Sequence, residues 1–276
     1  MLYLKLLLLS GFLLTYNNVL QAQIAPTLVP SGGFEIDGGL QSNTPTVGAG
    51  DWVLGTGGNY VLNNNGTAVN PSKTQLFTDA YNTSADLTFS SGSKFNDDPN
   101  TWSWSASSAS DKNDINNAMY HIATDASNNT WLIVGGDRLS TNGTSYIDFE
   151  FLQNSLTRNP SGGFVSAGPN GGRTVNDIAL SMEYSNGGSV ATVHIYFWKL
   201  VGSGYKFVEQ TIPPLVAFGA TNAANQGVPF GAFGNTAFSP FQFVEAAVNL
   251  TAFFGAVEPC FGISVKTLIV ETKASI

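Results

Sequence analysis

The chain has 276 residues, of which 43% are hydrophobic and 11% are charged, and its formal net charge is −8 at pH 7. So acidic a chain has no excess of Lys and Arg to neutralise phosphates, which argues against nucleic acid and against an anionic membrane surface as partners. A single cysteine, Cys260, excludes an intrachain disulfide.

The N-terminal residues 1–22 have the layout of a secretory signal peptide. Lys5 precedes an apolar run, and the small residue Ala22 precedes the sequence QIAP. The polar residues 16–18 interrupt the run, which is therefore too short for a spanning helix of about 20 apolar residues. We expect a secreted mature chain, 23–276, without a transmembrane segment, free or associated with a cell surface. An uncleaved membrane anchor is the alternative.

Short apolar blocks between clusters of Gly, Asn, Ser and Pro run through the whole mature chain. Most of these blocks alternate or are rich in β-branched and aromatic residues, which is typical of strands. The pattern predicts an all-β fold: a single β-sandwich over 23–276, jelly-roll-like, with long Gly-, Asn- and Ser-rich loops.

Acidic residues gather at three places in the first half of the mature chain. They are Glu35 and Asp37 in FEIDGG, Asp97 and Asp98 in NDDPN, and Asp111 and Asp114 in SDKNDINN. Carboxylate oxygens are preferred ligands of calcium, although none of the three has the spacing of an EF-hand loop. Asp and Asn also cap turns through their own backbone. Calcium, the one cofactor that the sequence suggests, and turn capping are both kept as explanations.

The stretch KFNDDPNTWSW, residues 94–104, joins an acidic turn to two tryptophans. On a strand, Trp102 and Trp104 would point to the same face because they are two residues apart. If that face is the interior of the sandwich, both rings belong to the core. If it is exposed, the two rings form a platform on which a sugar can stack.

The firmest local prediction is a β-hairpin formed by residues 131–134 and 146–152. The Asn-Gly pair at 142–143 favours the positive φ angles of a hairpin turn. In the second strand, Asp148 and Glu150 alternate with apolar residues, so the two carboxylates share one face.

The second half of the chain continues the pattern. Residues 158–177 are too rich in Gly and Pro for a strand and are expected to form a long loop. Residues 242–255 suit a short helix or a strand, and strand or mixed structure is slightly favoured. The remaining strands are expected in residues 177–188, 190–200, 205–212 and 260–275, the second and third of these forming a hairpin around VGSG.

Catalytic motifs are lacking in the sequence. It contains neither a nucleophile elbow, a zinc-binding helix motif, a P-loop nor a dinucleotide fingerprint. Of the two histidines, His194 lies in the middle of a predicted strand and His121 has no Ser or Cys nucleophile beside it. A pair of carboxylates suffices for a glycosidase, so that activity is kept as a distant third possibility behind non-enzymatic functions.

Several segments together resemble a known family. GGFEIDGGL, DKNDINNAMYHIATD, WLIVGGDRLSTNGTSYIDFEFLQN and KTLIVETKAS are similar to the N-terminal β-rich module of large secreted bacterial surface proteins. Such proteins occur in Bacteroidetes, with gliding-motility or sorting C-termini, and in actinobacteria. The resemblance implies an exported adhesin-like module, without catalytic residues to carry over. Since the chain ends at Ile276, we expect either a fragment of a longer surface protein or a stand-alone secreted form.

A looser similarity links the two central strands to β-sandwich modules that bind carbohydrate or haem. It places Asp137, Arg138, Asp148 and Glu150 beside a ligand cleft, with a structural Asp137–Arg138 ion pair as the alternative. The sequence therefore predicts a secreted, non-enzymatic, adhesin-like binding or structural module whose partner is an extracellular glycan or surface protein. The alternative is a carbohydrate-binding module.

Overall fold

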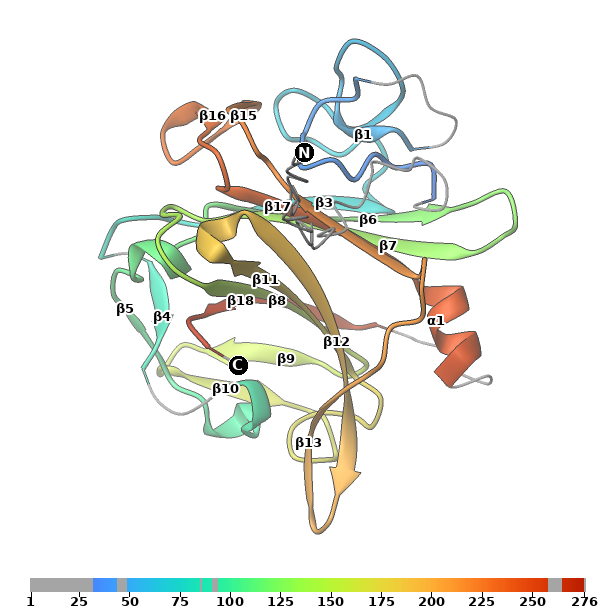
Figure 1. Cartoon of the computed structure of the whole chain (residues 1–276). Helices are drawn as coiled ribbons and strands as arrows, with labels where there is room; N and C mark the ends of the chain where they lie inside the picture. The colour runs from blue at the N-terminus through green and yellow to red at the C-terminus, as the bar shows by residue number, and fades with distance from the viewer. Residues whose placement is uncertain (1–31, 44–48, 85, 91–93, 258–264, 276) are drawn as a thin grey trace, which may run out of the picture.

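The computed structural model describes residues 32–43, 49–84, 86–90, 94–257 and 265–275. The expected signal peptide and Cys260 lie outside these residues. Two five-stranded antiparallel sheets face each other (Figure 1). The first, called the β7 sheet, has the order β14 (Ala217–Thr221), β17 (Phe243–Asn249), β7 (Thr130–Asp137), β6 (Asn117–Thr124) and β3 (Thr74–Thr78). The second, the β8 sheet, has the order β13 (Gly204–Glu209), β12 (Val190–Val201), β11 (Ile178–Ser185), β8 (Ser145–Leu152) and β18 (Thr267–Lys273). The predicted all-β sandwich is confirmed.

Smaller elements surround the two sheets. The two-stranded pairs are β1 (Asp51–Val53) with β2 (Tyr60–Leu62), β4 (Leu87–Phe89) with β5 (Trp104–Ala106), β9 (Leu156–Asn159) with β10 (Gly163–Ser166), and β15 (Gln226–Ala232) with β16 (Asn235–Phe238). The helical turns are η1 (Lys94–Asn96), η2 (Pro99–Thr101), η3 (Asp111–Asn113), η4 (Asn186–Gly188) and α1 (Leu250–Val257). None of the helices in the described part of the chain has the length and apolar character needed to span a membrane.

The main core lies between the two sheets. The apolar residues of β8 that alternate with Asp148 and Glu150 point inward, as expected, and Phe149 is fully buried there. They meet Leu132 and Val134 of β7. Burial of each large apolar side chain contributes about 1.5–3 kcal/mol relative to exposure, so this layer holds the sandwich together.

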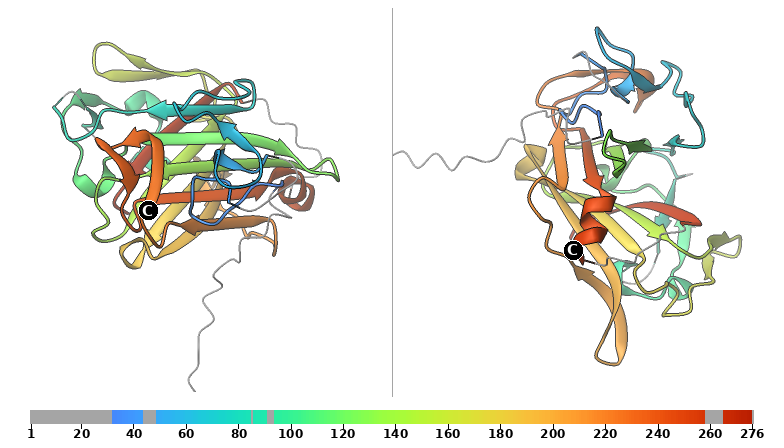
Figure 2. Two further views of the ribbon diagram at one scale, coloured as in Figure 1. Left: turned by 90° about the horizontal axis from the view of Figure 1, so that it is seen from above. Right: turned by 90° about the vertical axis from the view of Figure 1, so that its right-hand side faces the viewer.

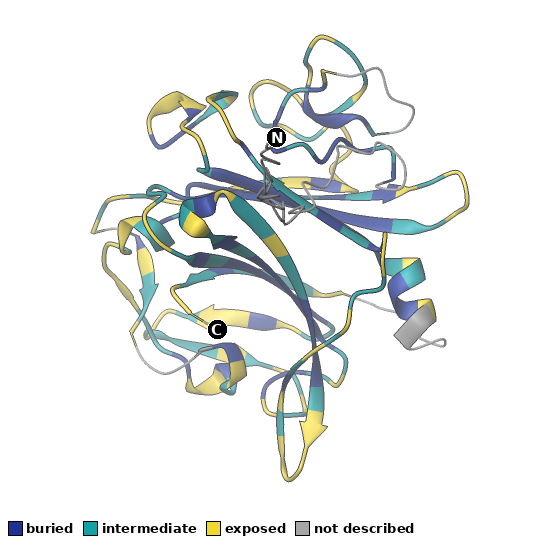
Figure 3. Cartoon of the chain, viewed as in Figure 1, coloured by how far each residue is buried: buried dark blue, intermediate teal, exposed yellow. Residues whose placement is uncertain are grey.

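A second core covers the opposite face of the β7 sheet. The N-terminal segment and the β15–β16 pair lie on the side of this sheet that faces away from the β8 sheet (Figures 1 and 2). Phe34 and Trp52, both fully buried, pack there against Trp131 and Ile133 of β7. Because β7 is buried on both faces, its apolar residues form a continuous run instead of alternating with polar ones. The buried central strands and the exposed tip of the β12–β13 hairpin are contrasted in Figure 3.

The predicted hairpin between β7 and β8 is wrong, because the two strands belong to different sheets. Gly143 has a positive φ of 75°, as the Asn-Gly pair favours, but Asn142 does not. Both edges of each strand are already occupied: β7 pairs with β6 and β17, and β8 pairs with β11 and β18. The connection therefore crosses from one sheet to the other. The β12–β13 hairpin is confirmed, with Val201 paired to Gly204 across a two-residue turn.

Two other segments differ from expectation or refine it. Residues 158–177, expected to be a loop, contribute to the β9–β10 pair before a true loop begins. Residues 242–255 are mixed, as slightly favoured: β17 runs directly into α1. Asn249 causes the change, because its side-chain oxygen accepts a hydrogen bond of 2.8 Å from the amide of Ala252 and so caps the helix.

Candidate functional site

Three buried carboxylates share the outer face of the β8 sheet. Asp148 and Glu150 come from β8, and Glu271 comes from β18, where it lies directly opposite Asp148 in the antiparallel register. Asp148 and Glu150 are fully buried, and Glu271 is 6% exposed. Carboxylates so close together in a water-poor environment repel each other unless cations or protons compensate them.

Two cations compensate part of this charge. Arg173, fully buried, donates two hydrogen bonds of 3.0 Å each to the two carboxylate oxygens of Glu150. Its guanidinium also lies 4.6 Å from the ring centroid of Trp198. Lys273 forms an ion pair with Asp148. Arg173 thus fixes the loop before β11 onto the sheet, because a planar guanidinium matches a carboxylate with two parallel bonds.

The third carboxylate has no cation of its own. Burial raises the pKa of Glu271 well above its ordinary value, and the neighbouring Glu150 and Asp148 raise it further, although Arg173 and Lys273 oppose the shift. With three acids and two bases in the group, one carboxylate is left over, and Glu271 is the one without a salt bridge in the described chain. No protein donor within the described residues reaches its Oε2 atom, which is buried.

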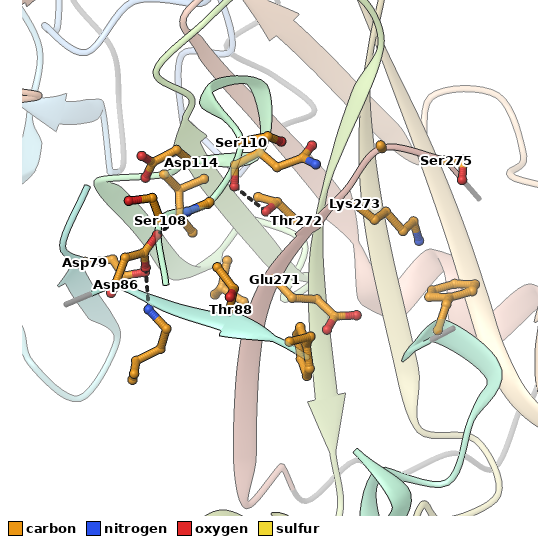
Figure 4. Close-up of a pocket in the computed structure, with 18 residues that line it drawn as sticks. Asp79, Asp86, Thr88, Ser108, Ser110, Asp114, Glu271, Thr272, Lys273 and Ser275 are labelled. Atoms are coloured by element: carbon orange, nitrogen blue, oxygen red, sulfur yellow. Dashed lines mark hydrogen bonds between the residues drawn. The ribbon is translucent and has the colours of Figure 1, made fainter. Parts of the chain in front are cut away.

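Glu271 lines a pocket of about 530 Å³, called here the acidic pocket. β4, the 108–115 segment and β18 form its walls, and its charged lining residues are Asp79, Asp86, Asp114, Glu271 and Lys273. Figure 4 shows the three aspartates on one side and the two β18 residues along the other.

Asp114 is the second carboxylate in this pocket with an unused oxygen. It is 2% exposed, and its Oδ2 accepts a hydrogen bond of 2.7 Å from the amide of Asn82. Its Oδ1 has no hydrogen-bond donor among the described residues. Burial raises the pKa of Asp114, and the nearby Asp86 and Asp79 raise it further, while the bond from Asn82 opposes the shift. Asp86, by contrast, is saturated by the amides of Leu87 (2.6 Å) and Ala109 (3.1 Å).

A second hollow of about 400 Å³, called here the aromatic pocket, adjoins the first along β4. Phe77, Phe89, Trp104 and Phe164 contribute to its lining, and Asp79 and Thr88 line both hollows. Trp104 is half-buried, and its indole N–H is held by the carbonyl oxygens of Asn159 (3.2 Å) and Gly163 (3.1 Å). These bonds fix the ring, so its position does not depend on a ligand.

The two tryptophans of the 94–104 stretch have different roles. Trp102 precedes β5 instead of lying on it, and its ring is 2% exposed. It packs edge-on against Phe89 and Phe164 and lies under Arg173. Trp102 is therefore a core residue and offers no free face, whereas Trp104 lines the aromatic pocket.

Asp137 and Arg138, predicted beside a ligand cleft, are fully buried and line neither of the two hollows. Burial raises the pKa of Asp137 to about 7, and it accepts bonds from the amides of Asn116 (2.7 Å) and Asn117 (2.9 Å). Arg138 instead donates to Ser145 Oγ at 2.9 Å. No salt bridge joins Asp137 to Arg138 in this described part of the chain, so both serve as anchors of loops.

The buried Asp148 and Glu150 do not line the acidic pocket, but Asp148 lies opposite Glu271, which does. The residues that connect them to it, Glu271 and Lys273, were not predicted. Their signal was the alternation in TLIVETK, which places both on one face of the last strand. Arg173 had no comparable signal, since it lies in a Gly-rich loop.

The predicted calcium ligands are spread over the molecule. Glu35 and Asp37 lie near Asp51 and Glu245. Burial raises the pKa of Asp51 well above its ordinary value, and the charges of Glu245, Asp37 and Glu35 raise it further. Glu245 accepts hydrogen bonds from the amides of Asp37 (2.8 Å) and Gly38 (2.6 Å) and from the indole of Trp52 (2.9 Å). This cluster fastens the N-terminal segment to β17.

The other two pairs also act in local structure. Asp98 caps η2 by accepting a bond of 2.9 Å from the amide of Asn100. The backbone carbonyl of its neighbour Asp97 accepts a bond of 2.7 Å from Arg173. Asp111 is exposed, outside the lining of the acidic pocket, whereas Asp114 lines it. Across the residues that the structure describes, no group of three or more Asp, Glu, His or Cys side chains is arranged to hold a metal ion.

A scan against models of known protein families, a search of curated proteins and a search of solved structures each found no match for this chain. Its function is therefore argued from the geometry of the cleft.

Proposed function

We propose that the chain is a secreted, non-enzymatic binding module of the adhesin-like type, and that its cleft binds carbohydrate. The cleft consists of the aromatic pocket and the acidic pocket. The observation that carries the proposal is the position of Trp104, a half-buried ring in a hollow that shares the β4 wall with a polar, carboxylate-lined pocket.

A sugar ring presents two kinds of surface, and the cleft offers a match for each. The C–H face of a pyranose packs on a flat aromatic side chain, for which the fixed ring of Trp104 is suited. Sugar hydroxyls donate hydrogen bonds, for which Asp79, Asp114 and Thr88 supply acceptors. The volumes of the two hollows, about 530 and 400 Å³, lie in the range of small-molecule sites.

The arrangement of the carboxylates supports binding more than hydrolysis. A glycosidase needs an acid and a second carboxylate that both reach the scissile bond. Asp148 and Glu150 line neither hollow, and they are engaged by Lys273 and Arg173, so this pair does not face a ligand in the cleft.

The test is a glycan-array screen of the purified chain, followed by calorimetric titration with the best saccharide. Trp104→Ala should weaken binding by about tenfold or more, which corresponds to ~1.4 kcal/mol, and Trp104→Phe should weaken it less. Leu200→Ala is the control, because Leu200 is 58% exposed on the distant β12–β13 hairpin. Absence of any saccharide binding, or equal binding by the folded Trp104→Ala variant, would refute the proposal.

A further inference from the structure

We propose that the acidic pocket binds the ammonium group of an amino sugar, so that the module recognises glycans with unacetylated hexosamine residues. This inference rests on the proposed function and adds the chemical class of its ligand. It is drawn from the unused acceptors of the pocket, from its charge and from its dimensions.

The described lining of the acidic pocket contains acceptor atoms that the protein leaves without a hydrogen-bond donor. Glu271 Oε2, Asp114 Oδ1 and Asn113 Oδ1 are buried acceptor atoms without a donor among the described residues, and all three residues line the acidic pocket. Glu271 and Asp114 are more than nine-tenths buried. A buried acceptor without a partner is destabilising, so a ligand that brings hydrogen-bond donors is favoured here.

The lining of the acidic pocket carries more negative than positive charge. Four carboxylates line the pocket, and Lys273 is the only basic side chain among its described lining residues. The ammonium of Lys273 is already paired with Asp148 and lies 3.5 Å from the ring centroid of Phe95. The remaining charge is therefore negative, which favours a cationic ligand and repels uronic and sialic acids.

The acidic pocket suits an organic cation better than a metal ion. Calcium needs six to eight oxygens at about 2.3–2.6 Å, and no group of three acidic, His or Cys side chains in the described residues is arranged for it. An ammonium group needs only a few acceptors, since it has three donors. The pocket is also large enough for a sugar ring that carries the group.

The geometry also predicts a proton exchange. Because burial and neighbouring carboxylates raise the pKa of Glu271, an ammonium beside Glu271 should drive its ionisation. Binding should then release a proton to the buffer, and the measured heat should vary with the ionisation enthalpy of the buffer.

The experiment is calorimetric titration of the purified full chain, near pH 6 and at low salt, with three tetrasaccharides: tetraglucosamine, its fully N-acetylated form and cellotetraose. We expect tetraglucosamine to bind at least tenfold more tightly than the two neutral sugars, with an affinity that falls as salt is added. Glu271→Gln and Asp114→Asn should each reduce this preference by roughly tenfold to a hundredfold, as expected for the loss of a charged hydrogen bond.

The controls remove equal charge outside the pocket. The control variants are Asp111→Asn and Glu209→Gln. Asp111 lies three residues from Asp114 but does not line the pocket, and Glu209 is exposed on the β8 sheet. Both should bind like the unmodified chain, and thermal unfolding verifies that every variant is folded. Glu271→Gln is nearly isosteric and removes a buried repulsion, so we expect it to fold.

The outcomes separate the two proposals. Equal affinity for the amine and for the N-acetylated sugar, with both lost in Trp104→Ala, would overturn the inference and leave carbohydrate binding standing. Absence of binding to every saccharide, on the array and in solution, would overturn both proposals. A rise in melting temperature with calcium chloride alone, abolished by Glu271→Gln, would overturn the inference in favour of a metal site.

Discussion

The buried pair of Arg173 and Glu150 gives the sharpest prediction about stability. In Arg173→Met the aliphatic stem still packs against Trp198, but Glu150 loses both of its 3.0 Å hydrogen bonds. A fully buried carboxylate is then left without a cation, close to Asp148. Removal of one member of a buried ion pair costs about 3–5 kcal/mol, which is a large part of the stability of an ordinary domain.

The double variant Arg173→Met/Glu150→Met tests this reasoning. Replacement of both charges by packed apolar groups is often neutral, so the double variant should unfold within about 1 kcal/mol of the unmodified chain. Urea unfolding at several pH values is the assay.

The sign of the pH effect follows from linkage. The folded pKa of Glu150 lies above its unfolded value of 4.5, because burial raises it, and loss of Arg173 raises it further. The folded chain then keeps a proton that the unfolded chain releases, so the penalty in Arg173→Met relative to the unmodified chain is smallest at low pH. It grows by up to ~1.4 kcal/mol per pH unit once the pH exceeds the folded pKa that Glu150 has in the unmodified chain. A single variant as stable as the double variant at pH 7, or a penalty independent of pH, would refute the argument.

Two further predictions concern the aromatic residues and His121. Trp102→Ala should lower the free energy of unfolding by about 3–5 kcal/mol, whereas Trp104→Ala should lower it much less; comparable losses in chemical denaturation would contradict the assignment of Trp102 to the core and Trp104 to the cleft. Burial lowers the pKa of His121 from 6.5 to about 4. Between these two pH values the unfolded chain binds a proton at His121 and the folded chain does not. This contribution should cost about 3 kcal/mol as the pH falls from 7 to 4, and the loss should be missing in His121→Gln, measured by thermal unfolding across that range.

Local patterns predicted the strands of this protein better than their pairing. The alternation in β8 correctly placed Asp148 and Glu150 on one face, because side-chain direction depends only on the strand itself. Pairing depends on which edges are free after the whole sandwich assembles. Gly143 therefore has the positive φ expected of the Asn142–Gly143 pair, yet the segment joins strands of different sheets.

The same distinction applies to the candidate site. Trp104 was predicted because aromatic residues are conspicuous in sequence, but its separation from Trp102 depends on where β5 begins. Arg173 meets Glu150 across 23 residues, from a loop without periodicity. Glu271 becomes a site residue only because β18 pairs with β8, which no local pattern in the sequence specifies.

The buried acidic residues of this lightly charged chain support the proposal of a ligand site. Of the acidic residues that the structure describes, ten are buried. They are Glu35, Asp51, Asp86, Asp114, Asp137, Asp148, Glu150, Asp177, Glu245 and Glu271. Several are saturated by the fold: Glu245 accepts two amides and an indole, and Glu150 accepts both branches of a guanidinium. A carboxylate that serves structure alone is expected to be completed in this way.

Besides Asp51 and Asp148, whose buried oxygens also lack a hydrogen-bond partner in the described chain, Asp114 and Glu271 depart from that rule. Each keeps a buried oxygen without a donor in the described chain, and both line one pocket whose charge is negative. A ligand in the acidic pocket that carries hydrogen-bond donors and positive charge would supply what both carboxylates lack, while the fixed ring of Trp104 in the adjoining aromatic pocket offers an apolar face for stacking.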